Sequence, residues 1–303
     1  MALKPSAGGL ESPALPPADV GRLPTAGGAG MRFSLIEGLR ARIRSIERAP
    51  VSLSSPPADH GTGFTRPACT LTPWTFGIVE IDHALPWGGL DPSGLHEIQP
   101  RTHSDSWAAV GFALGLLRRR MAAIGAAGKN LSLWAFSPNA VHEFGRPYGP
   151  GLRAFGIDPS ELLMVEARRS GDLAWTLEEG IKARALIAVL GQIDGANWTL
   201  GRRLALAAQA HRTPCLLISS PGTGELGAAM TRWRIETAPS CPHPFDASAP
   251  GARRWRATLE RCRWGPTGLT WDLEWSDDAY RFRLAAPLAD RADDPGWRLQ
   301  RTA

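Results

Sequence analysis

Residues 100–107 stand where a nucleotide-binding protein would hold a phosphate. They read Pro-Arg-Thr-His-Ser-Asp-Ser-Trp, and they separate a predicted short strand (94–99) from a predicted long amphipathic helix that begins near Ser104. In this arrangement the free backbone N–H groups and the helix dipole favour an anion at the start of the helix. A working phosphate loop at that place has the pattern G-x-x-x-x-G-K-[ST].

The loop lacks the residue types that this chemistry needs. It contains no glycine and no lysine; Ser106 falls roughly where the lysine belongs, and Trp107 where the magnesium-binding hydroxyl belongs. Pro100 also removes one backbone donor from the phosphate cradle. We therefore expect the frame of a phosphate site without its chemistry, and no bound cofactor.

Weak anion binding by the same loop is an alternative. Arg101, Thr102, Ser104 and Ser106 offer donors near the helix N-terminus. The favoured interpretation is simpler: Ser104 or Asp105 acts as an ordinary helix N-cap.

Composition sets broad limits on function. The chain has 303 residues, 43% of them hydrophobic, and a formal charge of +5 from 34 Lys+Arg against 29 Asp+Glu. Nearly all cations are arginines, which suit phosphate or carboxylate partners. The excess is too small to indicate nucleic-acid binding by itself.

Cysteines and apolar segments give further limits. The four cysteines, Cys69, Cys215, Cys241 and Cys262, form no C-x-x-C pair, so neither a disulfide framework nor a structural zinc site is predicted. The sequence has neither a long apolar run nor the apolar core of a signal peptide, which predicts a cytoplasmic protein without a membrane span.

The N-terminal part divides into three predicted segments. Residues 1–30 are rich in Pro, Gly, Ala and Ser and should be disordered, and either Met1 or Met31 could be the true start. A helix is expected within 31–50, followed by a linker, 51–71. The helix has an apolar stripe at helical spacing, formed by Ile36, Leu39, Ile43 and Ile46. The stripe either packs on its own domain or docks on a partner; the two interpretations are nearly even.

Residues 72–284 are predicted to form the core. Strands are expected at 75–80, 94–99, 131–136, 161–166, 185–190 and 215–219, with helices between them, among them 172–182 and 199–210. This alternation predicts a three-layer α/β domain with a mostly parallel sheet. Beyond Met230 a period of two predicts strands at 232–236, 255–259, 269–275 and 280–284, the last three forming an antiparallel meander. The tail, 285–303, should be loose.

Several stretches resemble the ImuA family, RecA-related proteins of bacterial mutagenesis cassettes. They are GGLDPSGLHEI (88–98), YGPGLRAFGIDPSELLMVEA (148–167), LGRRLALAAQA (200–210), TRWRIE (231–236) and TLERCRWGPTGLTWDLEW (258–275). The similarity spans roughly residues 35–284. It implies a RecA-like core and the possibility of RecA-like self-association.

The resemblance also implies a function. ImuA proteins belong to the SOS response and act in error-prone translesion DNA synthesis, together with the polymerase-like protein ImuB and an error-prone DNA polymerase. We expect a non-catalytic adaptor. Two alternatives stay open: a DNA-stimulated ATPase with an atypical nucleotide site, and a cell-division inhibitor of the SulA type. A complete RecA-like core is larger than a simple inhibitor would need.

A RecA-like ATPase also needs acids where two core strands end. The expected strand 131–136 is followed by no acid before Glu143, and the expected strand 185–190 ends at Gly191, with Asp194 three residues beyond. Loss of the lysine and both acids would remove the charge stabilisation of phosphoryl transfer. The sequence therefore predicts no ATP hydrolysis.

In RecA-like folds the loops after the central strands face single-stranded DNA. By position these are residues 192–199 and 220–231, and aromatic and Arg side chains there could stack on bases and hold phosphates. The candidates are Trp198, Arg202, Arg203, Arg232 and Arg234. The competing and slightly favoured interpretation is that Trp198 packs on its own helix, and that Arg232 and Arg234 pair across the sheet, with Asp272 and Glu274 available.

Overall fold

The computed structural model describes residues 71–286, apart from 125–130 and the single positions 196, 223, 225 and 244. All of these residues belong to the second of two compact units, Ile46–Ala303. The predicted tail 1–30, the predicted helix 31–50, nearly all of the linker 51–71 and the tail from 287 lie outside the described residues. The same holds for the apolar stripe of Ile36, Leu39, Ile43 and Ile46.

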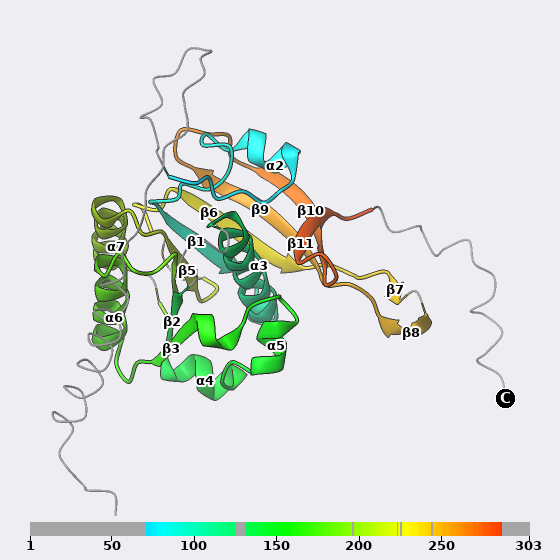
Figure 1. Ribbon diagram of the computed structural model, residues 1–303, viewed down its shortest axis with the longest axis horizontal. Helices are drawn as coiled ribbons and strands as arrows, with labels where there is room; N and C mark the ends of the chain where they lie inside the picture. The colour runs from blue at the N-terminus through cyan, green and yellow to red at the C-terminus, as the bar shows by residue number, and fades with distance from the viewer. Residues whose placement is uncertain are drawn as a thin grey trace, which may run out of the picture. The chain divides into compact units, whose positions relative to one another are not determined.

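In the described part of the chain, nine strands form one sheet in the order β11-β10-β9-β6-β1-β5-β4-β2-β3 (Figure 1). The strands are β1 (Leu95–Pro100), β2 (Ser132–Phe136), β3 (Leu162–Glu166), β4 (Val189–Ile193), β5 (Cys215–Ser219), β6 (Thr231–Thr237), β9 (Arg254–Cys262), β10 (Leu269–Ser276) and β11 (Arg281–Leu284). The strands from β6 to β3 pair in parallel, whereas β9, β10 and β11 are antiparallel. The predicted α/β class is confirmed, and the meander extends the main sheet.

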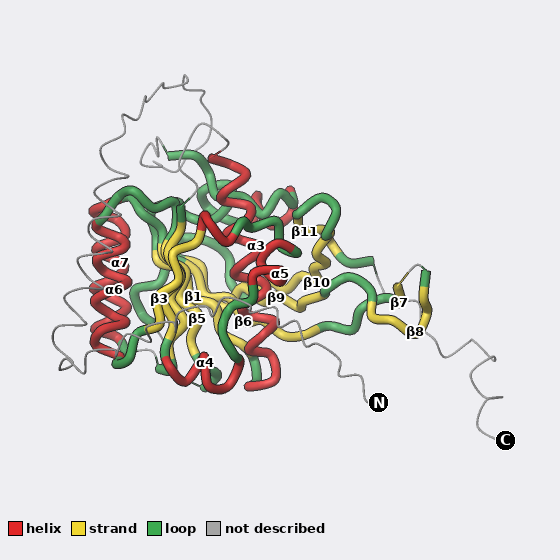
Figure 2. The backbone as a smooth tube through the Cα atoms, turned by 60° about the horizontal axis from the view of Figure 1, so that its bottom comes forward, coloured by secondary structure: helices red, strands yellow, loops and turns green. Residues whose placement is uncertain are grey.

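Helices cover both faces of the sheet. They are α2 (Val79–Ala84), α3 (Ser106–Ile124), α4 (Pro138–Phe144), α5 (Gly149–Arg153), α6 (Ser170–Lys182) and α7 (Trp198–His211), with short 3-10 turns at His103–Asp105 and Pro159–Glu161. The helices α6 and α7 lie on one side of the strands and α3 on the other (Figure 2). Within the described ranges, no helix is both long and apolar enough to cross a membrane.

The sheet separates two apolar cores because side chains alternate along each strand. On β1, Leu95 belongs to the core under α6 and α7, whereas Ile98 belongs to the core under α3. The α3 core also holds the meander. The ring of Phe112 lies 5.9 Å from that of Trp233 and 5.6 Å from that of Phe282. The core under α3 thus fixes the helix that follows the candidate loop.

Two predicted elements differ from the structure. Residues 75–80 are not one extended strand, because α2 begins at Val79; Asp82 accepts hydrogen bonds from the N–H groups of Phe76 (2.7 Å) and Gly77 (2.9 Å), which bends the chain ahead of the helix. The strand expected at 185–190 is β4, Val189–Ile193. At Gly191 a Cβ atom would lie 2.7 Å from side chains on α6 and β5, so this glycine permits close packing and does not end the strand.

Candidate functional site

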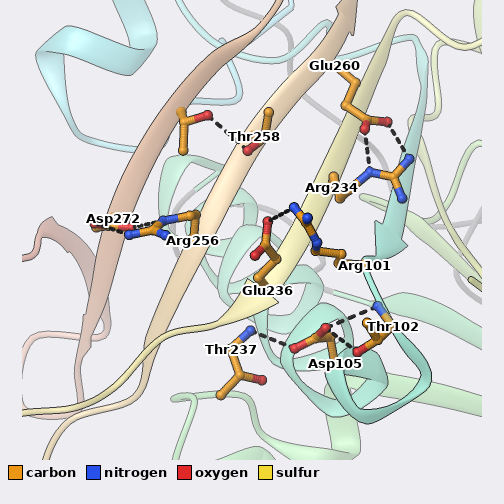
Figure 3. Close-up of polar contacts among 11 residues, drawn as sticks. Arg101, Thr102, Asp105, Arg234, Glu236, Thr237, Arg256, Thr258, Glu260 and Asp272 are labelled. Carbon is orange, nitrogen blue, oxygen red and sulfur yellow. Dashed lines mark hydrogen bonds and ion pairs between the residues drawn. The ribbon is translucent and has the colours of Figure 1, made fainter.

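The loop after β1 is closed by its own carboxylate. Asp105 Oδ2 accepts hydrogen bonds from the backbone N–H (3.1 Å) and the hydroxyl (2.6 Å) of Thr102, and Oδ1 accepts the backbone N–H of Thr237 on β6 (2.8 Å) (Figure 3). Burial opposes ionisation, but the hydrogen bonds from Thr102 and Thr237 outweigh it and lower the pKa of Asp105. A negative charge therefore stands at the place where a phosphate would bind. The N-cap residue is Thr102, and Asp105 closes its capping box from the third position of the turn, so the prediction that Ser104 or Asp105 is the N-cap was wrong.

The other polar groups of this loop are also engaged with protein. The N–H of Arg101 donates to Ile235 O (2.9 Å), and its guanidinium pairs with Glu236 (3.0 Å). Ser106 Oγ donates to His103 O (2.7 Å), and the hydroxyl of Ser104 hydrogen-bonds that of Thr102 (2.8 Å). These contacts tie the loop to β6 and to itself.

The side chain of Trp107 places an aromatic ring at the start of α3. Its side chain is about half exposed, and its ring meets that of Phe144 at the end of α4 with centroids 5.4 Å apart. The ring of His103 lies 5.6 Å from Phe144. A bulky apolar cluster therefore occupies the place of the magnesium-binding hydroxyl.

The position of Asp194 corrects one prediction. Because β4 runs to Ile193, Asp194 directly follows the strand instead of lying three residues beyond its end. Its carboxylate accepts hydrogen bonds from Ser137 Oγ (2.6 Å) and Asn139 Nδ2 (3.1 Å), which follow β2. An acid thus stands at the carboxyl end of β4, held to the neighbouring strand end.

Glu143, the nearest acid after β2, does not lie at the end of that strand. Glu143 lies in α4 and is exposed; its Oε2 is 4.0 Å from Nε2 of His103 in the loop. Within the described ranges, no three His, Cys, Asp or Glu side chains gather as a metal site would require.

The DNA candidates on α7 remain at the surface. Trp198 is exposed, and the guanidinium of Arg202 lies 5.2 Å above its ring. Arg203 is ion-paired with Glu178 of α6. A Cβ atom at Gly227 would lie 3.1 Å from Trp198 Nε1, so the indole also packs against the loop before β6.

The two arginines of β6 pair across the sheet. Arg232 is buried, and its Nε lies 2.8 Å from Oε2 of the buried Glu97 on β1, so Arg232 is withdrawn as a DNA contact. Arg234 forms two hydrogen bonds with Glu260. Cross-strand pairing was the favoured interpretation, but the expected partners were wrong.

Asp272 and Glu274, the expected partners, pair instead with other arginines, in a row of cross-strand polar contacts that forms a polar ladder on β9 and β10. Arg256 pairs with Asp272 at 2.9 Å, and Thr258 meets Thr270 at 3.0 Å (Figure 3). Arg254 pairs with Glu274 at 2.7 Å. These side chains lie opposite the face that packs on α3. Because the acids and arginines are matched, the ladder has little net charge to attract a phosphate backbone.

An aromatic groove was not predicted from the sequence. It has a volume of about 800 Å³ and lies between α3, the segment around α5, and the start of β9. Trp107 and Tyr148 line it as exposed rings; the guanidinium of Arg253 lies 4.9 Å above the ring of Phe155 and pairs with Asp277 at 2.6 Å. The available signal was the run of aromatic and glycine residues near 144–155.

Known proteins resemble this chain in sequence and in structure. No protein-family model matches the chain. Two proteins called "Protein ImuA", from two strains of Caulobacter vibrioides, are each 31% identical over 235 residues, which cover 71% of this chain and 90% of the relative. The crystal structure of the RadB recombinase is similar with a TM-score of 0.48 and 15% identity, covering 70% of this chain and 100% of that chain. On the identity and coverage of the Caulobacter relatives, the chain belongs to the ImuA family.

Proposed function

We propose that this protein is a non-catalytic accessory protein of SOS-induced, error-prone translesion DNA synthesis, and that it acts as an adaptor for ImuB and an error-prone polymerase. Membership of the ImuA family supports the process and the partners. The observation that carries the non-catalytic part is the carboxylate of Asp105, which takes the N–H groups of Thr102 and Thr237 at the start of α3.

Electrostatics support the absence of nucleotide chemistry. A phosphate at the start of α3 would meet a carboxylate, and two like charges about 4 Å apart repel by roughly 4 kcal/mol at the effective dielectric of a protein surface. The chain has lysines only at positions 4, 129 and 182. Of these, Lys182 is the one in the described ranges; it lies at the end of α6 and pairs with Glu178 at 2.8 Å.

One observation favours the alternative of a DNA-stimulated ATPase. Asp194 stands at the end of β4, where such an enzyme would place its magnesium-associated acid. Its carboxylate is engaged by Ser137 and Asn139, and the loop opposite offers no lysine. The alternative predicts hydrolysis that Asp194→Asn abolishes; the adaptor proposal predicts no hydrolysis for either form.

Complex formation with ImuB tests the adaptor role. We expect the full chain and purified ImuB to elute together without nucleotide, with the same stoichiometry after addition of Mg-ATP. Asp194→Asn should form the same complex, because Asp194 acts only as a local hydrogen-bond acceptor. Failure to associate, or a complex that requires ATP, would contradict the proposal.

Direct contact with single-stranded DNA is a second part of the proposal, supported by the exposed Trp198 and the guanidinium of Arg202 above it. Base stacking on an aromatic ring contributes about 1–3 kcal/mol per base. Trp198→Ala should therefore weaken binding of a fluorescent oligothymidylate by about 5- to 150-fold. Trp264→Ala is the matched control, because Trp264 is also exposed and lies in the turn after β9. Equal effects of the two variants would refute the contact.

A further inference from the structure

Three consecutive arginines, Arg118, Arg119 and Arg120, lie in the later turns of α3 and differ in their partners. Arg120 is buried and donates a hydrogen bond of 2.6 Å to a backbone carbonyl. Arg118 and Arg119 are partly exposed; the guanidinium of Arg118 lies 5.6 Å from the centroid of the Tyr280 ring, and Nη2 of Arg119 lies 3.5 Å from Thr75 Oγ1. Within the described part of the chain neither of the two forms an ion pair, and the Nε atom of each is buried without a hydrogen-bond partner.

Two glycines make room for these guanidinium groups. A Cβ atom at Gly77 would lie 2.6 Å from Nη2 of Arg119, and a Cβ atom at Gly156 would lie 2.8 Å from Nε of Arg118. The φ angles of the two glycines are 79° and 73°, in a region that residues with a side chain rarely adopt. Both arginine side chains therefore pack closely on the surrounding protein, and little conformational entropy remains to be lost when an anion binds to them.

A third arginine, Arg281 at the start of β11, adds its charge to the same place. Arg281 is exposed and forms no ion pair among the described residues. Burial lowers the pKa of Arg119 and Asp82 opposes this, but the charges of Arg118 and Arg281 lower it further. The carboxylate of Asp82 already accepts two backbone N–H groups, at 2.7 and 2.9 Å. Three cationic side chains thus repel one another beside an acid that is engaged elsewhere.

The residues around the three arginines indicate what kind of anion fits. Tyr280 is 37% exposed, and Val79, two positions beyond Gly77, is 64% exposed. Aromatic residues and arginines are enriched at protein interfaces. The exposed acids Glu80 and Asp278 flank the same surface in sequence and would repel the successive phosphates of a nucleic-acid strand. The surface therefore suits a short segment of protein that combines carboxylates with an apolar side chain.

We propose that Arg118, Arg119 and Arg281 bind an acidic segment of a partner protein. Carboxylates of the segment pair with the guanidinium groups, whose planar arrangement of donors matches a carboxylate. An apolar side chain of the segment packs beside Tyr280 and Val79. This surface is separate from the proposed contact with DNA, because α3 covers one face of the sheet and α7 covers the other (Figure 2).

Fluorescence anisotropy of a fluorescein-labelled peptide, Asp-Asp-Leu-Asp-Asp, titrated with the full chain tests this assignment. We expect the peptide to bind, and its uncharged counterpart Asn-Asn-Leu-Asn-Asn not to bind. Arg281→Gln should weaken binding by about 10- to 150-fold, as the loss of one charge-assisted hydrogen bond does. Because Arg281 is exposed, the circular dichroism of the variant should remain unchanged. Arg169→Gln is the matched control: it removes the same charge from another exposed arginine, before the first turn of α6 on the other face of the sheet.

Two further arms separate this contact from general attraction between charges. Arg119→Lys keeps the charge but loses the planar donors, so it should also weaken peptide binding. Excess oligothymidylate should not displace the peptide. No binding above that of the uncharged peptide, equal effects of Arg281→Gln and Arg169→Gln, unchanged binding by Arg119→Lys, or displacement by oligothymidylate would each overturn the proposal. The probe is a peptide, so the result does not depend on whether the chain binds ImuB.

Discussion

Replacing Arg232 by methionine should destabilise the protein by about 3 kcal/mol, because breaking a buried ion pair leaves a charge without its partner. Glu97 is 0% exposed and the side chain of Arg232 is 5% exposed, with 2.8 Å between Nε and Oε2. Methionine keeps the length and apolar stem of the side chain but supplies no donor. The carboxylate of Glu97 would then lie in the sheet without its cation.

The size of the loss follows from what remains around Glu97. Gln99 Nε2 still donates to Oε1 at 2.9 Å, and Ser219 Oγ lies 3.4 Å from the same oxygen. These two neutral donors place the loss near the lower end of the roughly 3–5 kcal/mol that a broken buried pair costs. For a domain of this size, about 3 kcal/mol corresponds to a fall in Tm of roughly 6–12 °C.

Urea unfolding followed by tryptophan fluorescence measures the effect, and the same sheet offers a matched control. Arg256 pairs with Asp272 at 2.9 Å, but these side chains are 52% and 47% exposed, so Arg256→Met should cost less than about 1 kcal/mol. The double variant Glu97→Gln with Arg232→Met should recover part of the loss, because it removes the uncompensated charge. If Arg232→Met costs no more than Arg256→Met, the reasoning about the buried pair is wrong.

Three further predictions concern the loop, the thiols and the helix packing. Asp105→Ala should lower the free energy of unfolding by about 0.5–2 kcal/mol at neutral pH, as the loss of a helix-capping hydrogen bond does. Hydrogen bonds lower the folded-state pKa of Asp105, so this stabilisation is present above the unfolded pKa and is lost as the pH falls through the folded pKa. The free energies of unfolding of the two forms, measured with urea, should therefore converge in acid. Burial raises the pKa of Cys215 to about 12, so in the native protein at mildly alkaline pH, peptide mass spectrometry should find iodoacetamide on the partly exposed Cys241 and not on Cys215; equal labelling would show that β5 opens. Gly191→Ala should destabilise by about 1–3 kcal/mol, because the added methyl would overlap the side chains of α6 and β5; Gly171→Ala, which adds a methyl in open space in the first turn of α6, should not destabilise, and thermal unfolding compares the two.

Local patterns predicted most elements of the fold, and the exceptions have physical reasons. The strand β4 was placed too early because Gly191 suggests a strand end, whereas the space for its side chain is filled by α6 and β5. Helix α4 (Pro138–Phe144) has no predicted counterpart with bounds of its own. In the structure Ser137 caps the helix and Pro138 is its first residue, a combination that the sequence does offer as a signal.

The sequence predicted which residue types the candidate site lacks, but not the contacts that stand in their place. The absence of lysine and glycine from residues 100–107 is visible in the sequence. That Asp105 reaches Thr237, 132 positions away, and that Arg232 reaches Glu97, 135 positions away, depends on parallel pairing of β1 with β6. A periodic pattern identifies strands and faces, but it does not specify which charged side chains meet across them.

The most direct test of the central claim is ATP hydrolysis by the full chain, measured with and without single-stranded DNA, beside the Asp194→Asn variant. We expect no turnover above background in any sample, because the loop after β1 is closed by the carboxylate of Asp105 and contains no lysine. A trace activity that is the same in both forms would come from a contaminant. DNA-stimulated hydrolysis that Asp194→Asn abolishes would contradict the account and establish Asp194 as part of a working nucleotide site.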